Sequence, residues 1–490
     1  MKMGSVLTLG LAGLLAAAPA GAQSPRAHPP RAPRGRPASA AVPHTLEQAL
    51  AATYLREPAL QAERAKLRAT DEDLPQARAG WRPTVVVAGG VGYGDGLSRS
   101  YNELFNVNGN SGWIKTRTDR DVATAQATIT QPLYTGGRTT ANVHRAKDLI
   151  MAERASMLAQ EETSLSDSVN AYVGVIEAEQ LLGLNVNNEQ VLAQQLRATE
   201  DQFQVGEVTR TDVAQAQAAL AGAKAQRETA EGNLQTARAT YRKTIGFDPP
   251  ATLVPPQPLH LPVATMRAAS DMAAANNPNV VAAEFNQAAA KNAVSAAIGQ
   301  LMPQLSLQGQ AFQAQNSGGR SSDVNGYTAL LNLSVPLYQG GSEYAAVRQA
   351  RQTVQQQQSL LASARRIAIQ NAVQAWQTYQ AATAAAASTR LAVRANEIAL
   401  IGVEREHLVG TRTTLDVLNA QQALVNSRVT LVQNLSSLVT ASYAVASAVG
   451  RLTARDLRLP VPLYDDTAYY NAVRNRWFGT GDPVAAYPGH

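Results

Sequence analysis

The sequence predicts a mixed α and β membrane protein in which three chains close a twelve-stranded β-barrel that continues into a long α-helical coiled-coil barrel. Three observations support this prediction: an internal duplication, two long proline-free stretches of helix-forming residues, and four segments with strand-like alternation in each chain. Four strands leave two open edges, and the smallest usual barrel has about eight strands. The chain must therefore pool its strands with copies of itself, and three copies give twelve strands.

The duplication consists of two pairs of matching segments at one common offset. Residues 129–147 match residues 333–351 at eight of 19 positions, and residues 205–220 match residues 409–424 at nine of 16, both at an offset of 204. Chance similarity between alanine-rich helices would not place the motifs PLYxGG and VGxxTxxDV at the same spacing twice. Each half of the chain is therefore predicted to form a helix, a strand pair, a long helix, a tight turn and a second long helix.

The duplication and the flanking composition divide the chain into five segments. They are a signal peptide (1–22), a Pro/Arg-rich linker (23–43), a first repeat (44–258), a second repeat (259–453) and a C-terminal tail (454–490). The strands are expected at about 83–101, 119–134, 303–315 and 327–338, and the long helical hairpins at 137–246 and 341–450. A charged start, a short apolar run and a small-residue cleavage site predict the signal peptide and a mature chain that begins near Gln23.

Composition excludes several classes of function. The chain has no cysteine, so neither disulfides nor thiolate-bound zinc can form. Its six histidines are scattered, and the glycine run at 89–96 lacks the Lys-Ser/Thr pair of a phosphate-binding loop. Of the net charge of +6, five positive charges come from Lys2 and four linker arginines, which leaves +1 for the rest of the chain. We therefore expect no enzyme activity, no cofactor or metal, and no nucleic-acid partner.

The proline-free stretches are far longer than a mean globular helix of about 11 residues. A helix over Arg138–Gln204 alone would extend roughly 100 Å and must bury an apolar stripe along its length. Two adjacent stripes repeat every seven residues: Val417, Leu424, Leu431, Leu438 and Val445 form one, and Leu418, Val425, Val432, Val439 and Ala446 form the other. Two seams let one helix contact partners on both sides, as a closed ring requires. A two-helix coiled coil with a solvated outer face is the alternative.

Each long helical stretch is interrupted once, at Val205-Gly206 and at Val409-Gly410. Glycine readily adopts the left-handed conformation that ends a helix. Thr211 and Thr414 are the expected N-caps of the returning helices, because a threonine hydroxyl accepts a hydrogen bond from a free backbone amide of the first turn. Each half therefore ends in a helical hairpin whose tip lies far from its strands.

The last predicted strand alternates most clearly. Its apolar residues Ala329, Leu331, Leu333 and Val335 share one face, and its polar residues Asn332 and Ser334 share the other. Such alternation over about ten residues is typical of outer-membrane strands, although a half-buried soluble sheet has the same pattern. In lipid, open edges would leave backbone groups unpaired at several kcal/mol each, so closure with other copies is required. The Gly-, Asn- and Ser-rich connections at 106–112 and 317–323 are expected at the outer surface.

The motifs PLYxGG, VGEVTRTDV and VGTRTTLDVLNAQ, together with the duplication, resemble the TolC-like outer-membrane factor family over roughly Thr45 to Leu452. The C-terminal segment Ala472–Gly479 resembles type I secretion members of that family. The resemblance implies a homotrimer in the cell outer membrane, in contact with outer-membrane lipid and with a long periplasmic extension. It also implies a periplasmic membrane-fusion adaptor, an inner-membrane ABC or RND-type transporter, and passage of an exported polypeptide or small molecules.

The same resemblance implies functional residues at the hairpin tips. The implied periplasmic gate residues are Arg412, Asp416, Thr211, Asp212, His407 and Asn419, and the implied adaptor contacts are Val205, Gly206, Val409, Gly410 and Thr411. In this reading Arg412 bonds near Thr211 and Asp212, and Asp416 lines the constriction. His407 and Asn419 depart from the family pattern of a tyrosine and a second aspartate, so the constriction is expected to carry three carboxylates. The alternative is that these are solvated surface charges worth at most about 1 kcal/mol.

We therefore predict the export duct of a type I protein secretion system. The first alternative is the outer-membrane channel of a tripartite multidrug efflux pump. The second, from another class, is a periplasmic coiled-coil adaptor or structural envelope protein without a pore. Heat-resistant trimers and single-channel currents would separate a duct from a spacer.

Overall fold

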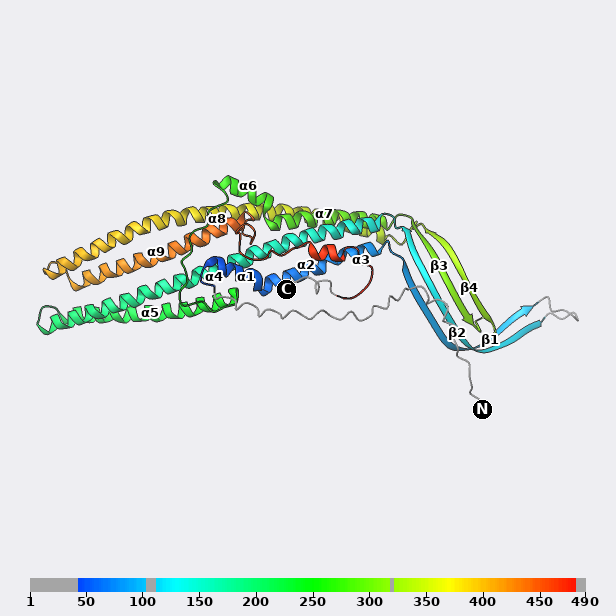
Figure 1. Ribbon diagram of the computed structural model, residues 1–490, viewed down its shortest axis with the longest axis horizontal. Helices are drawn as coiled ribbons and strands as arrows, with labels where there is room; N and C mark the ends of the chain where they lie inside the picture. Colours follow the sequence, from blue (N-terminus) through cyan, green and yellow to red (C-terminus); the bar gives the residue numbers. More distant parts are fainter. Residues whose placement is uncertain (1–42, 103–111, 318–320, 482–490) are drawn as a thin grey trace, which may run out of the picture. The chain divides into compact units, whose positions relative to one another are not determined.

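The computed structural model describes residues 43–102, 112–317 and 321–481. The predicted signal peptide, nearly all of the linker, most of the first connection between strands and the end of the tail lie outside the described residues. Figure 1 shows long helices that run side by side and a four-stranded sheet that follows at their ends.

The order of elements repeats, as the duplication predicts. In the first repeat, α1 (Leu46–Arg56), α2 (Pro58–Asp71) and α3 (Asp73–Ala79) precede β1 (Thr84–Asn102), β2 (Gly112–Tyr134), α4 (Arg138–Gln204) and α5 (Arg210–Ile245). In the second repeat, α6 (Met266–Asn276) and α7 (Pro278–Gly299) precede β3 (Gln304–Gln315), β4 (Asp323–Ser334), α8 (Ser342–Leu408) and α9 (Thr414–Ala448). A short helix, α10 (Ala468–Val473), lies in the tail.

The two repeats differ before their strands. Pro58 and Pro278 each begin a helix, where the missing N–H of proline costs nothing. The helix that begins at Pro278 then continues without a break to Gly299. In the first repeat, Pro75 cannot donate to the carbonyl of Asp71, and α2 and α3 are separate helices that meet at Glu72.

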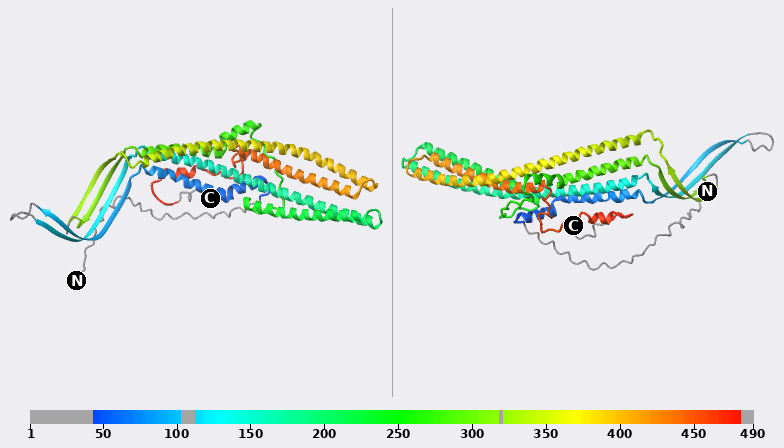
Figure 2. Two further views of the ribbon diagram at one scale, coloured as in Figure 1. Left: turned by 180° about the vertical axis from the view of Figure 1, so that it is seen from behind. Right: turned by 90° about the horizontal axis from the view of Figure 1, so that it is seen from above.

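The long helices form two hairpins, α4 with α5 and α8 with α9, and the views in Figure 2 agree on this pairing. α4 and α8 each have 67 residues. Both seven-residue stripes of α9 are buried or half-buried. In one stripe Leu424 packs with Val393 and Leu400 of α8, and in the other Leu418 packs with Leu192 of α4. The double seam therefore joins α9 to both hairpins. Among the described residues, no helix has the length and apolarity needed to cross a membrane.

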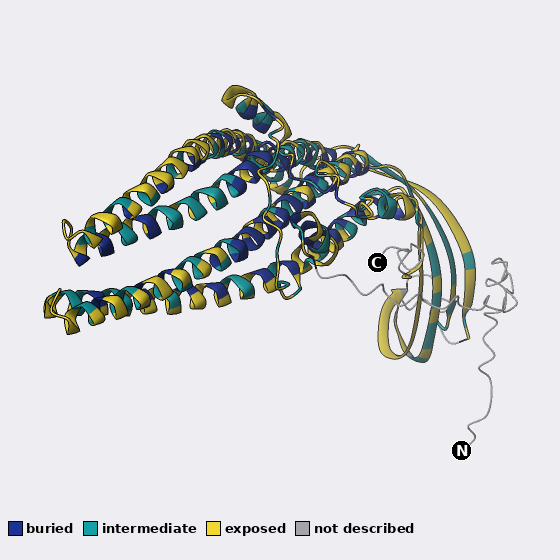
Figure 3. Ribbon diagram, turned by 60° about the vertical axis from the view of Figure 1, so that its left-hand side comes forward, coloured by how far each residue is buried: buried dark blue, intermediate teal, exposed yellow. Residues whose placement is uncertain are grey.

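The sheet is antiparallel, with the order β1-β2-β3-β4, so β1 and β4 are its free edges within the chain. The register gives it one mainly apolar face, which carries Val85, Val87, Ile129, Leu307, Leu331 and Leu333. The opposite, mainly polar face carries Thr128, Gln308, Gln310, Asn332 and Ser334. Most of these strand residues are exposed or half-buried in the single chain (Figure 3). The predicted alternation of the last strand is confirmed from Ala329 to Ser334, whereas Val335 lies after the end of the strand.

Two strands differ from their predicted limits. β2 begins at Gly112, seven residues before the predicted start, because β1 and β2 pair with each other beyond the end of β3. The residues after Val91 thus form a two-stranded ribbon with the first part of β2. β4 begins at Asp323, four residues before the predicted start, because it pairs with β3 as far as Gln315. It ends at Ser334, four residues before the predicted end, because Pro336 has no N–H for a ladder hydrogen bond.

The tail is attached to the helices by buried carboxylates of α4. Glu161 accepts a hydrogen bond from the backbone N–H of Ala454 at 2.7 Å, and Glu162 accepts one from Leu452 at 3.3 Å. Leu452 and Ala454 belong to the main apolar core. Burial raises the pKa of Glu161 and raises the pKa of Glu162 to about 8.

We expect this attachment to weaken as the pH rises from about 4.5 to above 8. The pKa of Glu162 is higher in the folded chain than its ordinary value of 4.5, so its contribution to stability is complete below 4.5 and is lost as the pH passes the folded value. Glu162→Gln should remove most of this pH dependence, because the amide oxygen still accepts the N–H of Leu452 and carries no charge. Amide hydrogen exchange of residues 450–456, corrected for intrinsic rates, measures it. Equal pH slopes in the two proteins would contradict the assignment.

Candidate functional site at the hairpin tips

A short connection between α8 and α9 forms the tip of the second hairpin. Gly410 has a φ of +80°, a left-handed conformation that glycine adopts without steric cost. Its N–H donates to the carbonyl of His407 at 2.9 Å, and the N–H of Thr411 donates to the carbonyl of Glu406 at 3.0 Å. These bonds satisfy carbonyls at the end of α8 and reverse the chain.

A capping box begins α9. The hydroxyl of Thr413 accepts the N–H of Asp416 at 3.3 Å, and the carboxylate of Asp416 accepts the N–H and the hydroxyl of Thr413, each at 2.9 Å. The bonds from the backbone and then from the hydroxyl of Thr413 lower the pKa of Asp416. The prediction that Thr414 caps this helix is wrong. The cap lies one residue earlier, because the carboxylate that completes the box stands three residues after Thr413.

The first tip repeats this geometry. Gly206 has a φ of +83°, and Thr209 caps α5. The carboxylate of Asp212 accepts the hydroxyl of Thr209 at 2.7 Å and its N–H at 2.9 Å, and these bonds lower the pKa of Asp212. The prediction that Thr211 is the cap is therefore wrong by two residues, for the same reason. Thr211 lies in the first turn of α5 and is exposed.

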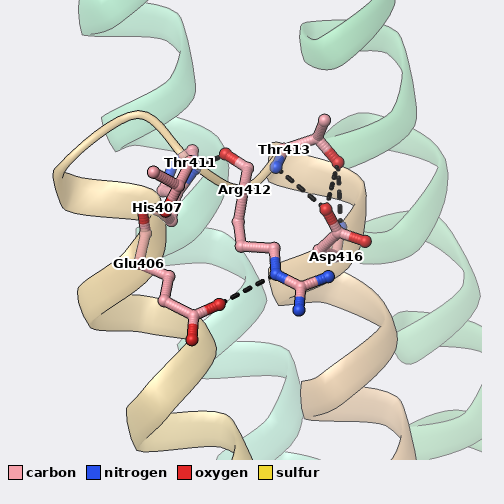
Figure 4. A network of polar contacts seen from close by, with 6 residues as sticks. All are labelled: Glu406, His407, Thr411, Arg412, Thr413 and Asp416. Atoms are coloured by element: carbon pink, nitrogen blue, oxygen red, sulfur yellow. Dashed lines mark hydrogen bonds and ion pairs between the residues drawn. The ribbon is translucent and has the colours of Figure 1, made fainter.

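Arg412 bonds within its own hairpin (Figure 4). Its Nε donates to Oε2 of Glu406 at 2.8 Å, which raises the pKa of Arg412. The Nδ1 of His407 lies 3.0 Å from the carbonyl oxygen of Arg412, so this nitrogen carries the proton. Within the described chain Arg412 therefore bonds to Glu406, and no such bond joins it to Thr211 or Asp212.

A hydrogen bond joins the two hairpins further from their tips. Nε2 of Gln421 donates to Oδ1 of Asn188 at 3.3 Å and ties α9 to α4.

The remaining predicted tip residues are largely exposed. Val205 and Val409 are apolar, yet 71% and 74% of their surfaces are accessible. Asn419 is exposed on the first turns of α9, and Asp416 is half-buried by its cap. The sequence analysis missed Glu406, which bonds to Arg412 six residues further along the chain. Helical pairs are three or four residues apart, so this spacing did not indicate a contact.

The duplicated hairpins, their matching tips and the open sheet define a class of outer-membrane channel with a periplasmic helical extension. A family profile described as "Outer membrane efflux protein" matches residues 49–246 and 269–451. The chain belongs to this family, which is that of TolC, and it is a non-enzymatic channel. The predicted family, fold class and outer-membrane localisation are confirmed.

Three relatives and one solved structure illustrate the similarity. Outer membrane efflux protein BepC of Brucella suis is 32% identical over 91% of this chain and 93% of the relative. Outer membrane protein TolC of Escherichia coli is 24% identical over 82% and 81%. Alkaline protease secretion protein AprF of Pseudomonas aeruginosa is 25% identical over 64% and 66%. The Campylobacter jejuni CmeC outer membrane channel shares the fold, with a TM-score of 0.72 at 14% identity over 88% of this chain and 89% of that one.

Proposed function

We propose that three copies of this chain form the export duct of a type I protein secretion system. The duct docks to a periplasmic membrane-fusion adaptor and, through it, to an inner-membrane ABC transporter that supplies the energy. The cargo passes as an unfolded polypeptide.

One observation carries the proposal of a closed trimer. β1 and β4 each have a single neighbour in the sheet, so each leaves a row of backbone groups without a ladder partner in the chain. The apolar face of this sheet suits lipid, where unpaired backbone groups cost several kcal/mol each. Pairing β1 of one copy with β4 of the next removes every edge and gives twelve strands.

Two observations favour protein secretion. The segment Ala472–Gly479 resembles type I secretion members of the family, and AprF is named as a protease secretion protein. BepC, which is named as an efflux protein, is more similar over the whole chain. The outer-membrane channel of a multidrug pump with an RND-type transporter is therefore the second candidate. The third candidate, a periplasmic structural protein without a pore, is dropped because the chain belongs to a channel family.

Deletion of the gene in its own bacterium separates the two candidates. A secretion duct predicts that a specific polypeptide disappears from the culture medium while susceptibility to small toxic compounds stays unchanged. Complementation with the intact gene should restore that polypeptide. Increased drug susceptibility with an unchanged set of secreted polypeptides would decide for the pump.

We propose the exposed tip residues Val205, Gly206, Val409, Gly410 and Thr411 as the adaptor contacts. Exposed valines at the ends of both hairpins support this, because a partner would bury them. The chain has no cysteine, so Val409→Cys introduces a unique crosslinking site. Capture of the adaptor by this variant, but not by Asn471→Cys in the tail, is the expected result.

The gate proposal predicts opposite effects at Arg412 and Glu406. In the closed ring Arg412 is proposed to bond to Asp212, so Arg412→Ser and Asp212→Ala should each raise single-channel conductance several-fold. Glu406 competes with Asp212 for the guanidinium of Arg412, so Glu406→Gln should strengthen the closed state. The conductance of this variant should be equal to or below that of the wild type. Recordings in planar bilayers measure all three variants. Wild-type conductance in both Arg412→Ser and Asp212→Ala would refute the lock.

A further inference from the structure

The C-terminal segment Arg474–Phe478 follows α10, the short red helix in Figure 1, and is hydrogen-bonded to the end of α3. Arg78 Nη1 donates to a main-chain carbonyl oxygen of this segment at 2.8 Å, and Arg82 Nη1 donates to another at 2.6 Å. The guanidinium of Arg82 also stacks on the ring of Trp477, 4.9 Å from its centroid. Arg82 stands two residues before Thr84, the first residue of β1. The segment therefore lies at the level where the helices end and the sheet begins.

The contacts of α3 show on which side of the helices the segment lies. Within α3, Arg78 binds the segment, whereas Gln76, Ala77 and Ala79 line a cavity whose walls include Ser306 and Asn332 on the polar face of the sheet. Arg82, which follows α3, both lines this cavity and binds the segment. Each residue turns an α-helix by about 100°, so Arg78 and Gln76, two residues apart, lie about 160° apart by the shorter way around the helix. The segment is thus on the side opposite the polar face.

The contacts of α4 agree. The guanidinium of Arg154 lies over the ring of Tyr470 in the tail at 5.3 Å, whereas Asn142 lines the same cavity as Gln76. Twelve residues separate Arg154 from Asn142, which places them about 120° apart around α4. Both helices therefore put the tail on the side that continues the apolar face of the sheet.

The segment combines exposed aromatic rings with positive charges. The exposed fractions of Trp477 and Phe478 are 64% and 89%. Arg78 and Arg82 donate to oxygens of the tail, Arg476 donates to the carbonyl of Gly481, and Arg474 is exposed. In the part of the chain that the structure describes, none of these four arginines forms an ion pair with a carboxylate. Aromatic rings beside arginines are typical of the membrane–water interface, where rings lie among headgroups and guanidinium groups bind phosphate.

We propose that Arg474–Phe478 is a lipid anchor. The rings of Trp477 and Phe478 insert among phospholipids of the periplasmic leaflet of the outer membrane, and Arg474 faces their phosphate groups. Membrane phospholipid is the occupant because the segment adjoins the apolar face, which begins at Val85, three residues after Arg82. The anchor holds the tail at the membrane surface whether the channel exports polypeptides or drugs.

A label at a single cysteine tests the anchor in the intact trimer. Phe478→Cys carries an environment-sensitive fluorophore, and the labelled protein is reconstituted into phosphatidylethanolamine–phosphatidylglycerol vesicles that contain a lipid with a nitroxide near its headgroup. Asn471→Cys, an exposed position on α10, is the matched control. We expect blue-shifted emission and several-fold stronger quenching at position 478. Arg474→Gln should reduce the quenching at position 478 in vesicles that contain phosphatidylglycerol.

Two outcomes would overturn the anchor. Equally weak quenching at the two positions would place Phe478 in water. A crosslink from position 478 to a neighbouring subunit, without quenching by lipid, would assign the segment to a subunit interface. Neither measurement depends on transport, so failure of the anchor leaves the proposed function untouched.

Discussion

Gly136→Ala is expected to destabilise the chain far more than Gly137→Ala, the same change at the next residue. Both glycines are left-handed, with φ of +65° and +80°. A Cβ at Gly136 would collide with the carbonyl oxygen of Gly299 and lie 2.6 Å from the Cβ of Met302, whereas a Cβ at Gly137 would meet nothing within 4 Å. Gly137→Ala should lower the free energy of unfolding only by the backbone strain of a left-handed alanine, about 1–3 kcal/mol. Gly136→Ala adds overpacking against backbone, for a total of roughly 4 kcal/mol.

The clash lies where the end of α7 meets the turn from β2 into α4, so its effect should reach the assembly. We expect Gly136→Ala to lose most of the heat-resistant trimer on gels, and Gly137→Ala to retain it. Gly340, the counterpart of Gly136 in the second repeat, has a φ of +70° and open space around its Cβ position. Gly340→Ala should therefore behave like Gly137→Ala. Similar losses in all three variants would mean that the close approach at Gly299 does not limit stability.

This asymmetry shows why the sequence predicts the fold better than its contacts. PLYxGG marks a turn in both repeats, but the motif does not show which of its glycines has no room for a side chain. Gly136 has none because Gly299, which is 163 residues away in the chain, lies against it. The long helices, the alternation and the double seam are local patterns with a fixed period, so they could be predicted. The attachment of the tail to Arg78 and Arg82 crosses almost 400 residues and leaves no local pattern.

The errors at the tips have a different cause. The Thr-x-x-Asp spacing of the capping boxes was present in the sequence at Thr209 and Thr413, and it would have located both caps. The partner of Arg412 was not predictable in this way. Its bond to Glu406 depends on how the chain turns at Gly410, and no sequence pattern specifies that geometry. The family motif led instead to a partner that Arg412 would have in the assembled trimer.

Leu331→Arg and Asn332→Arg place the same cation on opposite faces of β4. Leu331 is opposite Leu307 on the apolar face, and 63% of its surface is accessible in the single chain. Asn332 lies on the polar face, where its Nδ2 donates to Oε1 of Gln308 at 3.0 Å. If the apolar face meets lipid, Leu331→Arg puts three charges per trimer on the lipid side near the membrane–water interface, at up to about 1 kcal/mol each. The same charge at position 332 faces water in the lumen and costs little.

We therefore expect Leu331→Arg to lower the amount of outer-membrane trimer several-fold, and Asn332→Arg to assemble at close to the normal amount. Asn332→Arg should also shift the reversal potential in a salt gradient toward anion selectivity, because three added cations line the water-filled path. Trimer content of membrane fractions and bilayer recordings measure the two effects separately. Normal assembly of Leu331→Arg together with failure of Asn332→Arg would mean that the faces are reversed. Since the lipid anchor is placed by the same apolar face, that result would also move the tail to the lumen side.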